Sequence, residues 1–145
     1  MNNHILLVED DPSDIELAKR AIEKQQIPAE LILAEDGQEA LDYLLCTGKY
    51  EGANVPLPAV MLLDLKLPKV DGLAVLQQVR ANERTRALPV VILTTSTEQA
   101  DMLASYNFGA NSYVRKPVDL AEFYKIVAHL GTYWLGLNQT PWNIK

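Results

Sequence analysis

The hydrophobic positions of the chain fall into five short runs, each about as long as one β-strand. The runs at residues 4–8, 59–63 and 88–94 are almost continuously apolar, which is typical of central strands buried on both faces. Residues 30–34 and 112–116 complete the predicted set of strands.

Amphipathic helical patterns separate these runs. Apolar residues recur at helical spacing over about 12–25, 37–45, 72–82, 98–108 and 120–130. Asp36 and Asp119 each precede a glutamate by three positions, which predicts capping boxes, and Asp71 is placed to cap the third helix. The longest irregular stretch, 47–58, is predicted to be a surface excursion, and 83–86 a solvated turn.

Five strands alternating with five helices predict one α/β architecture. A doubly wound, five-stranded parallel sheet should carry helices on both faces, joined by right-handed crossovers. A chain of 145 residues with 48% apolar residues is long enough to bury a sizeable core as a single domain.

Composition excludes several classes of partner. The net charge of −6 argues against bare nucleic acid or an anionic membrane surface as a partner. No apolar run approaches the ~20 residues that span a bilayer. The single cysteine, Cys46, rules out an internal disulfide and fits a reducing compartment, so we expect a cytoplasmic protein.

Polar side chains stand where four of the five predicted strands end. Glu9 and Asp10 follow the first strand, Asp64 the third, Thr94 ends the fourth, and Lys116 ends the fifth. The carboxyl ends of parallel strands meet at one edge of a sheet, where open α/β sheets bind their ligands. The sequence therefore predicts a functional site at that edge.

The composition of this predicted site indicates phosphoryl chemistry. Its carboxylates repel one another unless positive charge joins them, and Lys116 supplies only one such charge. Oxygen ligands suit Mg²⁺, with Asp10 and Asp64 as direct ligands and Glu9 acting through water. Asp64 beside a metal could attack phosphorus and become an aspartyl phosphate, while the Thr94 hydroxyl donates to a phosphoryl oxygen.

The motifs at these strand ends resemble those of two-component response-regulator receiver domains. The resemblance covers about residues 4–131 and rests on the segments 7–12 (LVEDDP), 63–68 (LDLKLP) with Asp71-Gly72, 93–95 (LTT) and 113–117 (YVRKP). It implies a flavodoxin-like fold with strand order 2-1-3-4-5. The 47–58 insertion and the aromatic tail are most similar to single-domain regulators that pair with phytochrome-type histidine kinases.

The resemblance also assigns roles to the site residues. It implies that Asp64 is the phosphoacceptor, that Glu9 and Asp10 form the acidic pair, and that the main-chain carbonyl of Lys66 is a third metal ligand. Glu9 stands where many members have aspartate.

A second set of implied roles concerns the switch. Thr94 is implied as the switch hydroxyl and Tyr113 as the rotating aromatic. Lys116 is implied as the invariant lysine, which we expect to precede a cis peptide bond to Pro117. Thr95 is larger than the small residue often found after the switch hydroxyl.

The expected organisation is a receiver domain over 1–131 and a C-terminal extension over 132–145, without a separate output domain. The resemblance implies a histidine kinase and an unidentified downstream protein as partners, and the closer similarity points to a kinase of the phytochrome type. We expect the output surface on the fourth helix, fifth strand and fifth helix, with homodimerisation through exposed aromatic and apolar residues: Tyr106, Tyr113, Tyr124, Tyr133, Trp134, Leu137 and Trp142. The alternative is that the tail folds back onto the core of its own chain.

Two other classes share parts of the pattern. A flavodoxin-type FMN carrier would need a phosphate-binding loop after the first strand, where this chain is acidic. A dehalogenase-type phosphatase usually has a second aspartate two residues after its nucleophile, where this chain has Lys66, and a cap domain that this chain is too short to include.

Overall fold

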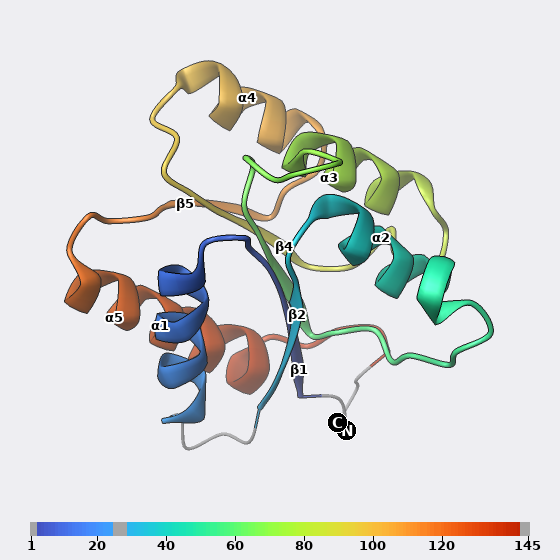
Figure 1. Ribbon diagram of the computed structural model, residues 1–145, viewed down its shortest axis with the longest axis horizontal. Coiled ribbons are helices and arrows are strands. Elements are labelled where there is room, and N and C mark those ends of the chain that lie inside the picture. The colour runs from blue at the N-terminus through green and yellow to red at the C-terminus, as the bar shows by residue number, and fades with distance from the viewer. Residues whose placement is uncertain (1–2, 25–28, 143–145) are drawn as a thin grey trace.

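A five-stranded parallel sheet forms the centre of the computed structural model, which describes residues 3–24 and 29–142 (Figure 1). The strand order is β2-β1-β3-β4-β5, which confirms the predicted fold class. The strands are β1 (His4–Val8), β2 (Glu30–Ala34), β3 (Val60–Leu63), β4 (Val90–Thr94) and β5 (Ser112–Arg115).

Helices cover both faces of the sheet. They are α1 (Pro12–Glu23), α2 (Gly37–Leu45), α3 (Gly72–Ala81), α4 (Gln99–Asn107) and α5 (Leu120–Gly131). Helices α1 and α5 pack together on one face, and α2, α3 and α4 lie on the other (Figure 1). Gln25, the predicted end of the first helix, lies outside the described residues. Over the described part of the chain, no helix combines the length and apolar character needed to cross a membrane.

The central strands are buried on both sides, as their continuous apolar runs predict. In β1, Ile5 and Leu7 face the core beneath α1 and α5, whereas Leu6 and Val8 face the core beneath α2 and α3. Strands β3 and β4 alternate in the same way. Because successive side chains point to opposite faces, a strand between two helix layers needs apolar residues at every position.

Aspartates begin four of the helices. Asp11 accepts a hydrogen bond from the Ser13 amide at 2.8 Å, and Asp36, Asp71 and Asp119 accept from amides in the first turns of α2, α3 and α5. The caps predicted at Asp36, Asp71 and Asp119 are therefore confirmed, and Asp11 is an additional one. The Glu39 carboxylate reaches back, but it accepts from the amide of Glu35 at 2.7 Å, one residue before the cap.

The two irregular regions of the α2–α3 side are tied together. Residues 47–58 contain one 3₁₀ turn, Gly48–Tyr50, and pack Val55 and Leu57 against the core. Arg84 donates hydrogen bonds to the carbonyls of Leu44 and Val55, at 3.3 and 2.7 Å. The expectation of a solvated turn at 83–86 is wrong for Thr85, which is fully buried. Its hydroxyl is satisfied there because it donates a hydrogen bond to the Val79 carbonyl at 2.6 Å.

The C-terminal tail packs largely onto the chain's own core. After α5 the chain continues in a π-helical segment, Thr132–Leu137, in which Leu135 is buried with Trp134 packed beside it. Trp142 packs against the opposite core, and its indole N–H donates to the Pro58 carbonyl at 3.3 Å. The expectation that Trp134 and Trp142 lie on an exposed face is therefore wrong, because both side chains are partly buried against the core, which removes apolar area from water.

Candidate functional site

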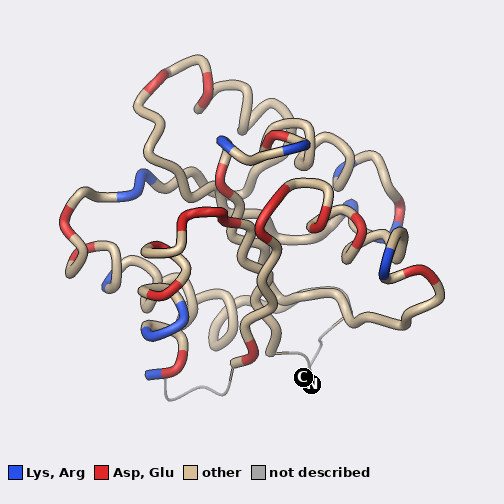
Figure 2. Tube along the Cα trace, viewed as in Figure 1, with Lys and Arg blue, Asp and Glu red and all other residues tan. Residues whose placement is uncertain are grey.

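The predicted edge of the sheet is where the acidic residues gather. Figure 2 shows acidic segments following β1 and lying beside the loop that follows β3. Glu9 and Asp64 come directly after β1 and β3, which pair in parallel register, so the two carboxylates lie side by side. Gly72 begins α3 against this edge, where an added Cβ would lie only 2.2 Å from the Asp64 carbonyl oxygen. Glycine at this position therefore allows α3 to approach the backbone of Asp64.

Lys116 lies at the centre of the cluster. Its ammonium group donates hydrogen bonds to Glu9, to Asp14 at 3.0 Å and to Asp64 at 3.2 Å, and only 5% of its side chain is exposed. The structure thus brings Glu9, Asp64 and Lys116 together as predicted. It adds Asp14, which the sequence analysis missed. Asp14 lies in the first turn of α1, and no local sequence pattern indicates that its carboxylate reaches the site.

Three carboxylates of the site could hold one metal ion. Ligand oxygens of Glu9, Asp10 and Asp64 all lie within 4.8 Å of one another. Both Glu9 oxygens already have partners, since one accepts from Lys116 and the other from the amides of Asp10 and Asp11 at 3.1 Å. Asp11 uses its own carboxylate to cap α1 and stays outside the cluster. An oxygen-only donor set with an exposed Asp10 fits a small, hard divalent cation.

Burial and charge act in opposite directions on the two central groups. Burial raises the pKa of Glu9 to about 7, although the hydrogen bond and the charge of Lys116 oppose this rise. Burial lowers the pKa of Lys116, but hydrogen bonding to Glu9 and the charges of Asp64 and Glu9 outweigh it, so its pKa lies above the ordinary value. Lys116 therefore keeps its positive charge at neutral pH.

The two predicted switch residues lie on neighbouring strands beside this cluster. Thr94 is completely buried, and its hydroxyl oxygen accepts from the Ser96 amide at 3.4 Å. The Tyr113 ring is half-buried against the core, and its hydroxyl donates to the Ser96 carbonyl at 3.3 Å. Thr95 points to solvent. Ser96 was not singled out from the sequence, although its place two residues after Thr94 puts it in the same loop.

The expected cis peptide between Lys116 and Pro117 is wrong. Among the described residues every peptide bond is trans, including this one. Lys116 reaches its three carboxylate partners with a trans bond, because its long side chain rather than the main chain spans the distance. Trans is also the common state for a bond that precedes proline.

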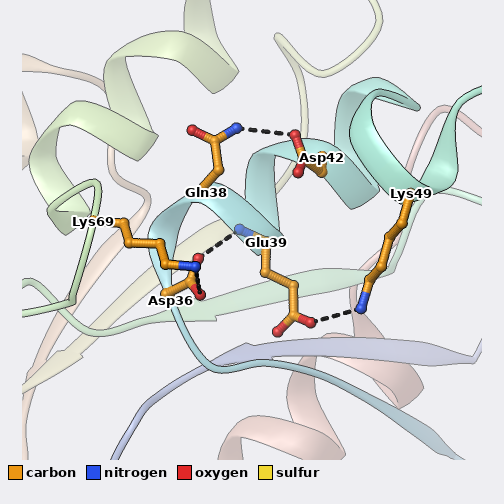
Figure 3. Close-up of a pocket in the computed structure, with 6 residues that line it drawn as sticks. All are labelled: Asp36, Gln38, Glu39, Asp42, Lys49 and Lys69. Atoms are coloured by element: carbon orange, nitrogen blue, oxygen red, sulfur yellow. Dashed lines mark hydrogen bonds and ion pairs between the residues drawn. The ribbon is translucent and has the colours of Figure 1, made fainter.

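A second charged hollow lies next to the site but differs from it. It encloses about 200 Å³ between the start of α2 and the loop that follows β3 and is lined by Asp36, Gln38, Glu39, Asp42, Lys49 and Lys69 (Figure 3). Lys49 pairs with Glu39 at 3.0 Å and Lys69 with Asp36 at 3.5 Å. Both lysines are exposed, so these pairs remain in contact with water.

Comparison with known proteins places the chain in a family. Residues 5–128 match the model of the response regulator receiver domain. The chain is 44% identical over 137 residues to a probable methanogenesis regulatory protein, FilR2, of Methanothrix harundinacea, covering 94% of this chain and 86% of the relative. It is 40% identical over 131 residues to the response regulator Rcp1 of Synechocystis sp., covering 90% and 88%.

Solved structures agree with this result. The Mn²⁺-bound form of Rcp1 superimposes with a TM-score of 0.90 at 39% identity, covering 96% of this chain and 99% of the other. The phosphorylated cyanobacterial phytochrome response regulator RcpA gives a TM-score of 0.91 at 35% identity, covering 97% and 99%. The chain therefore belongs to the response regulator receiver domains, the signalling proteins that accept phosphoryl groups from histidine kinases in two-component systems.

Proposed function

We propose that Asp64 is the phosphoacceptor of this receiver domain. The observation that carries the proposal is the position of its carboxylate, 3.2 Å from the Lys116 ammonium and within 4.8 Å of ligand oxygens of Glu9 and Asp10. The other carboxylates are less suitable. Asp14 lies in the first turn of α1, outside the group of possible metal ligands, and one oxygen of Glu9 accepts hydrogen bonds from two backbone amides. Like Glu9, Asp64 directly follows a central strand, but the only amide hydrogen bond to its carboxylate that the described residues show is a long one from Lys66 at 3.4 Å.

The proposed reaction is an exchange of bonds at phosphorus. An Asp64 carboxylate oxygen attacks the phosphorus of a kinase phosphohistidine, the P–N bond breaks, and the imidazole leaves as an aspartyl phosphate forms. Lys116 then pairs with a phosphoryl oxygen, and the Thr94 hydroxyl donates to another. Later attack of water on phosphorus returns the carboxylate and releases phosphate. In this proposal the protein promotes both its own phosphorylation and its own dephosphorylation.

We assign the metal of this site as Mg²⁺. Asp10 and Asp64 would bind it directly, Glu9 would act through water because both its oxygens are already engaged, and the Lys66 carbonyl would complete the protein ligands. When bound, Mg²⁺ neutralises phosphoryl oxygens during transfer. The Mn²⁺-bound form of the related Rcp1 supports a divalent ion, and the oxygen-only ligand set supports magnesium.

A phytochrome-type histidine kinase is the proposed partner, with the reaction in the cytoplasm. The support comes from the similarity to RcpA, whose structure is that of a phytochrome response regulator, and from the absence of any internal disulfide partner for Cys46. We place the receiver domain at 1–131 and the extension at 132–145, of which residues 143–145 lie outside the described part of the chain.

The proposed output is a change of binding surface read by a downstream protein. Thr94 would move toward the phosphoryl group, and the half-buried Tyr113 would turn further inward into the space that Thr94 leaves. Helix α4 beside these residues exposes Met102, Leu103 and Tyr106, which supports this face as the contact surface.

A homodimer remains part of the proposal, now with fewer candidate residues. Tyr133 and Leu137 of the tail are exposed, Leu137 to 70%, whereas Trp134 and Trp142 pack on the core. Light scattering with and without Mg²⁺ and beryllofluoride should show a dimer that Leu137→Ser weakens, whereas Tyr106→Ser would do so if α4 forms the interface. A wild type that stays monomeric at tens of micromolar in both states would end the dimer proposal.

The phosphoacceptor proposal is tested by intact mass. Incubation with Mg²⁺ and acetyl phosphate should add one phosphoryl group to the wild type and none to Asp64→Asn. Asp36→Asn is a matched control, because Asp36 is an acid of the neighbouring hollow and asparagine can still cap α2. A persistent gain in Asp64→Asn, with no neighbouring acid found modified, would contradict the assignment.

A further inference from the structure

One serine connects both switch residues to helix α4. Ser96 lies in the loop between β4 and α4 and is 7% exposed. Its backbone contacts both switch residues, since its amide donates to the Thr94 hydroxyl oxygen at 3.4 Å and its carbonyl accepts from the Tyr113 hydroxyl at 3.3 Å. A shift of Ser96 would therefore change the hydrogen bonds of both Thr94 and Tyr113.

The side chain of Ser96 holds the beginning of α4. Its hydroxyl donates to an Asp101 carboxylate oxygen at 2.6 Å and accepts from the Glu98 amide at 3.2 Å. Glu98 stands at the N-cap position of α4 without a side-chain cap hydrogen bond of its own. Ser96 and Asp101 thus take the place of a conventional cap and fix the loop to the first turn of the helix.

We propose that the Ser96–Asp101 hydrogen bond is a latch that holds the unphosphorylated arrangement of this loop. While it is closed, Ser96 keeps its amide on Thr94 and its carbonyl on Tyr113. For Thr94 to turn toward Asp64, and for Tyr113 to move, the loop must shift and this hydrogen bond must weaken. Ser96 and Asp101 are positioning residues in this proposal, since they act through Thr94 and Tyr113. The inference rests on the proposed function of Asp64.

The strength of the latch sets the expected effect. A hydrogen bond to a charged group is roughly twice as strong as one between neutral groups, and the Ser96–Asp101 bond is short at 2.6 Å. A ligand that favours the shifted loop must work against this bond, so opening the latch in advance should tighten binding of that ligand. We expect roughly a ten-fold gain, which is within the usual range of coupling between sites.

In the experiment, beryllofluoride, which mimics a phosphoryl group, is titrated into the full chain in the presence of Mg²⁺. The bound species is followed by ¹⁹F NMR. Ser96→Ala and Asp101→Ala remove the latch from either side and should each bind about ten-fold more tightly than the wild type. Ser96→Thr keeps the hydroxyl and should remain near the wild type. Thr97→Ala is the matched control, because it removes an exposed hydroxyl from the next position of the same loop.

The outcomes separate the latch from its alternatives. If Ser96→Ala and Asp101→Ala bind beryllofluoride no more tightly than Thr97→Ala, or melt earlier with unchanged affinity, Ser96 is only a structural cap and the latch is contradicted. Should either alanine variant fail to fold, Asp101→Asn retains a neutral acceptor and should give a smaller gain of the same sign; no gain would overturn the proposal. A wild type that binds no beryllofluoride, or equal binding by Asp64→Asn, would instead overturn the phosphoacceptor assignment.

Discussion

Two clusters of acids and lysines lie near the same edge of the protein and behave differently. Around Lys116, the carboxylates of Glu9, Asp14 and Asp64 converge on one ammonium group in a buried position. In the hollow beside α2, Lys49 and Lys69 each pair with one carboxylate, and both lysines are exposed.

The difference shows what distinguishes a reactive site from a solvated surface. In the hollow, water screens the exposed ion pairs, and each lysine pairs with one carboxylate. These charges therefore contribute little electrostatic free energy to folding. In the buried cluster the negative charge of the ionised carboxylates exceeds the positive charge of Lys116, and either a proton on Glu9 or a bound cation reduces this excess. An excess of buried negative charge beside an exposed Asp10 is therefore a better indicator of function than the number of charged residues.

The largest effect that separates the clusters should come from removing one lysine. Lys116→Met should slow phosphorylation by acetyl phosphate by about 10²-fold or more, because it removes a buried charge aimed at the transferred group. Lys49→Met, whose side chain is 64% exposed, should change the rate by less than about two-fold. Time courses of intact mass measure both, and comparable losses in the two variants would erase the proposed distinction.

Removing one acid should have opposite effects on stability in the two clusters. In the presence of EDTA, Asp10→Ala should raise the free energy of unfolding by roughly 0.5 to 1 kcal/mol, since it relieves repulsion at a functional site. Asp36→Ala should lower it by about 1 kcal/mol, because Asp36 caps α2 through the Glu39 amide.

Urea unfolding provides the measurement for this pair. Saturating Mg²⁺ should stabilise the wild type more than Asp10→Ala, so the higher free energy of unfolding of Asp10→Ala should disappear. The lower free energy of unfolding of Asp36→Ala should not change, because this variant leaves the metal site intact. If both substitutions lower the free energy of unfolding in EDTA, repulsion between the carboxylates of the buried cluster does not destabilise the folded protein.

A smaller effect should appear in the dependence of stability on pH. The pKa of Glu9 in the folded protein, about 7, lies above its ordinary value of 4.5. Below pH 4.5 both states carry the proton, and the contribution to stability is fully present. As pH rises the unfolded state releases its proton first, so this contribution is lost until about pH 7.

Relative to Glu9→Gln, the wild type in EDTA should therefore lose stability between about pH 4.5 and 7. Urea unfolding at several pH values measures this difference. Parallel curves for the two proteins over that range would show that Glu9 ionises normally in the folded state.

The smallest effect should come from the exposed hollow. Lys49→Ala breaks the pair with Glu39 but leaves both groups to water, so the melting midpoint measured by circular dichroism should not change. A clear decrease in the midpoint would mean that the hollow contributes more to stability than its exposure suggests.

The sequence predicted most of the fold because three of its strands, β1, β3 and β4, are buried on both faces. Continuous apolar runs such as the one ending at Leu63 distinguish central strands, and aspartates such as Asp71 mark the helix starts. Because the carboxyl ends of parallel strands lie at one edge of the sheet, Glu9, Asp64 and Lys116 could be placed together from the sequence alone.

The features that the sequence did not predict depend on contacts between distant segments. Asp14 belongs to the site because Lys116 extends across the sheet edge to reach it, and no local pattern records that distance. The position of Trp142 depends on its packing against the segment that ends at Pro58. Ser96 acquires its role only when α4 brings Asp101 within 2.6 Å.

The most direct test of the account locates the phosphoryl group on the chain. The wild type is phosphorylated with Mg²⁺ and acetyl phosphate, reduced with borohydride to convert the acyl phosphate into an alcohol, digested, and mapped by mass spectrometry. We expect the reduced residue to be Asp64, and we expect no product when Mg²⁺ is omitted. Reduction at Glu9, Asp10 or Asp14 instead, or a product that forms equally in EDTA, would contradict it.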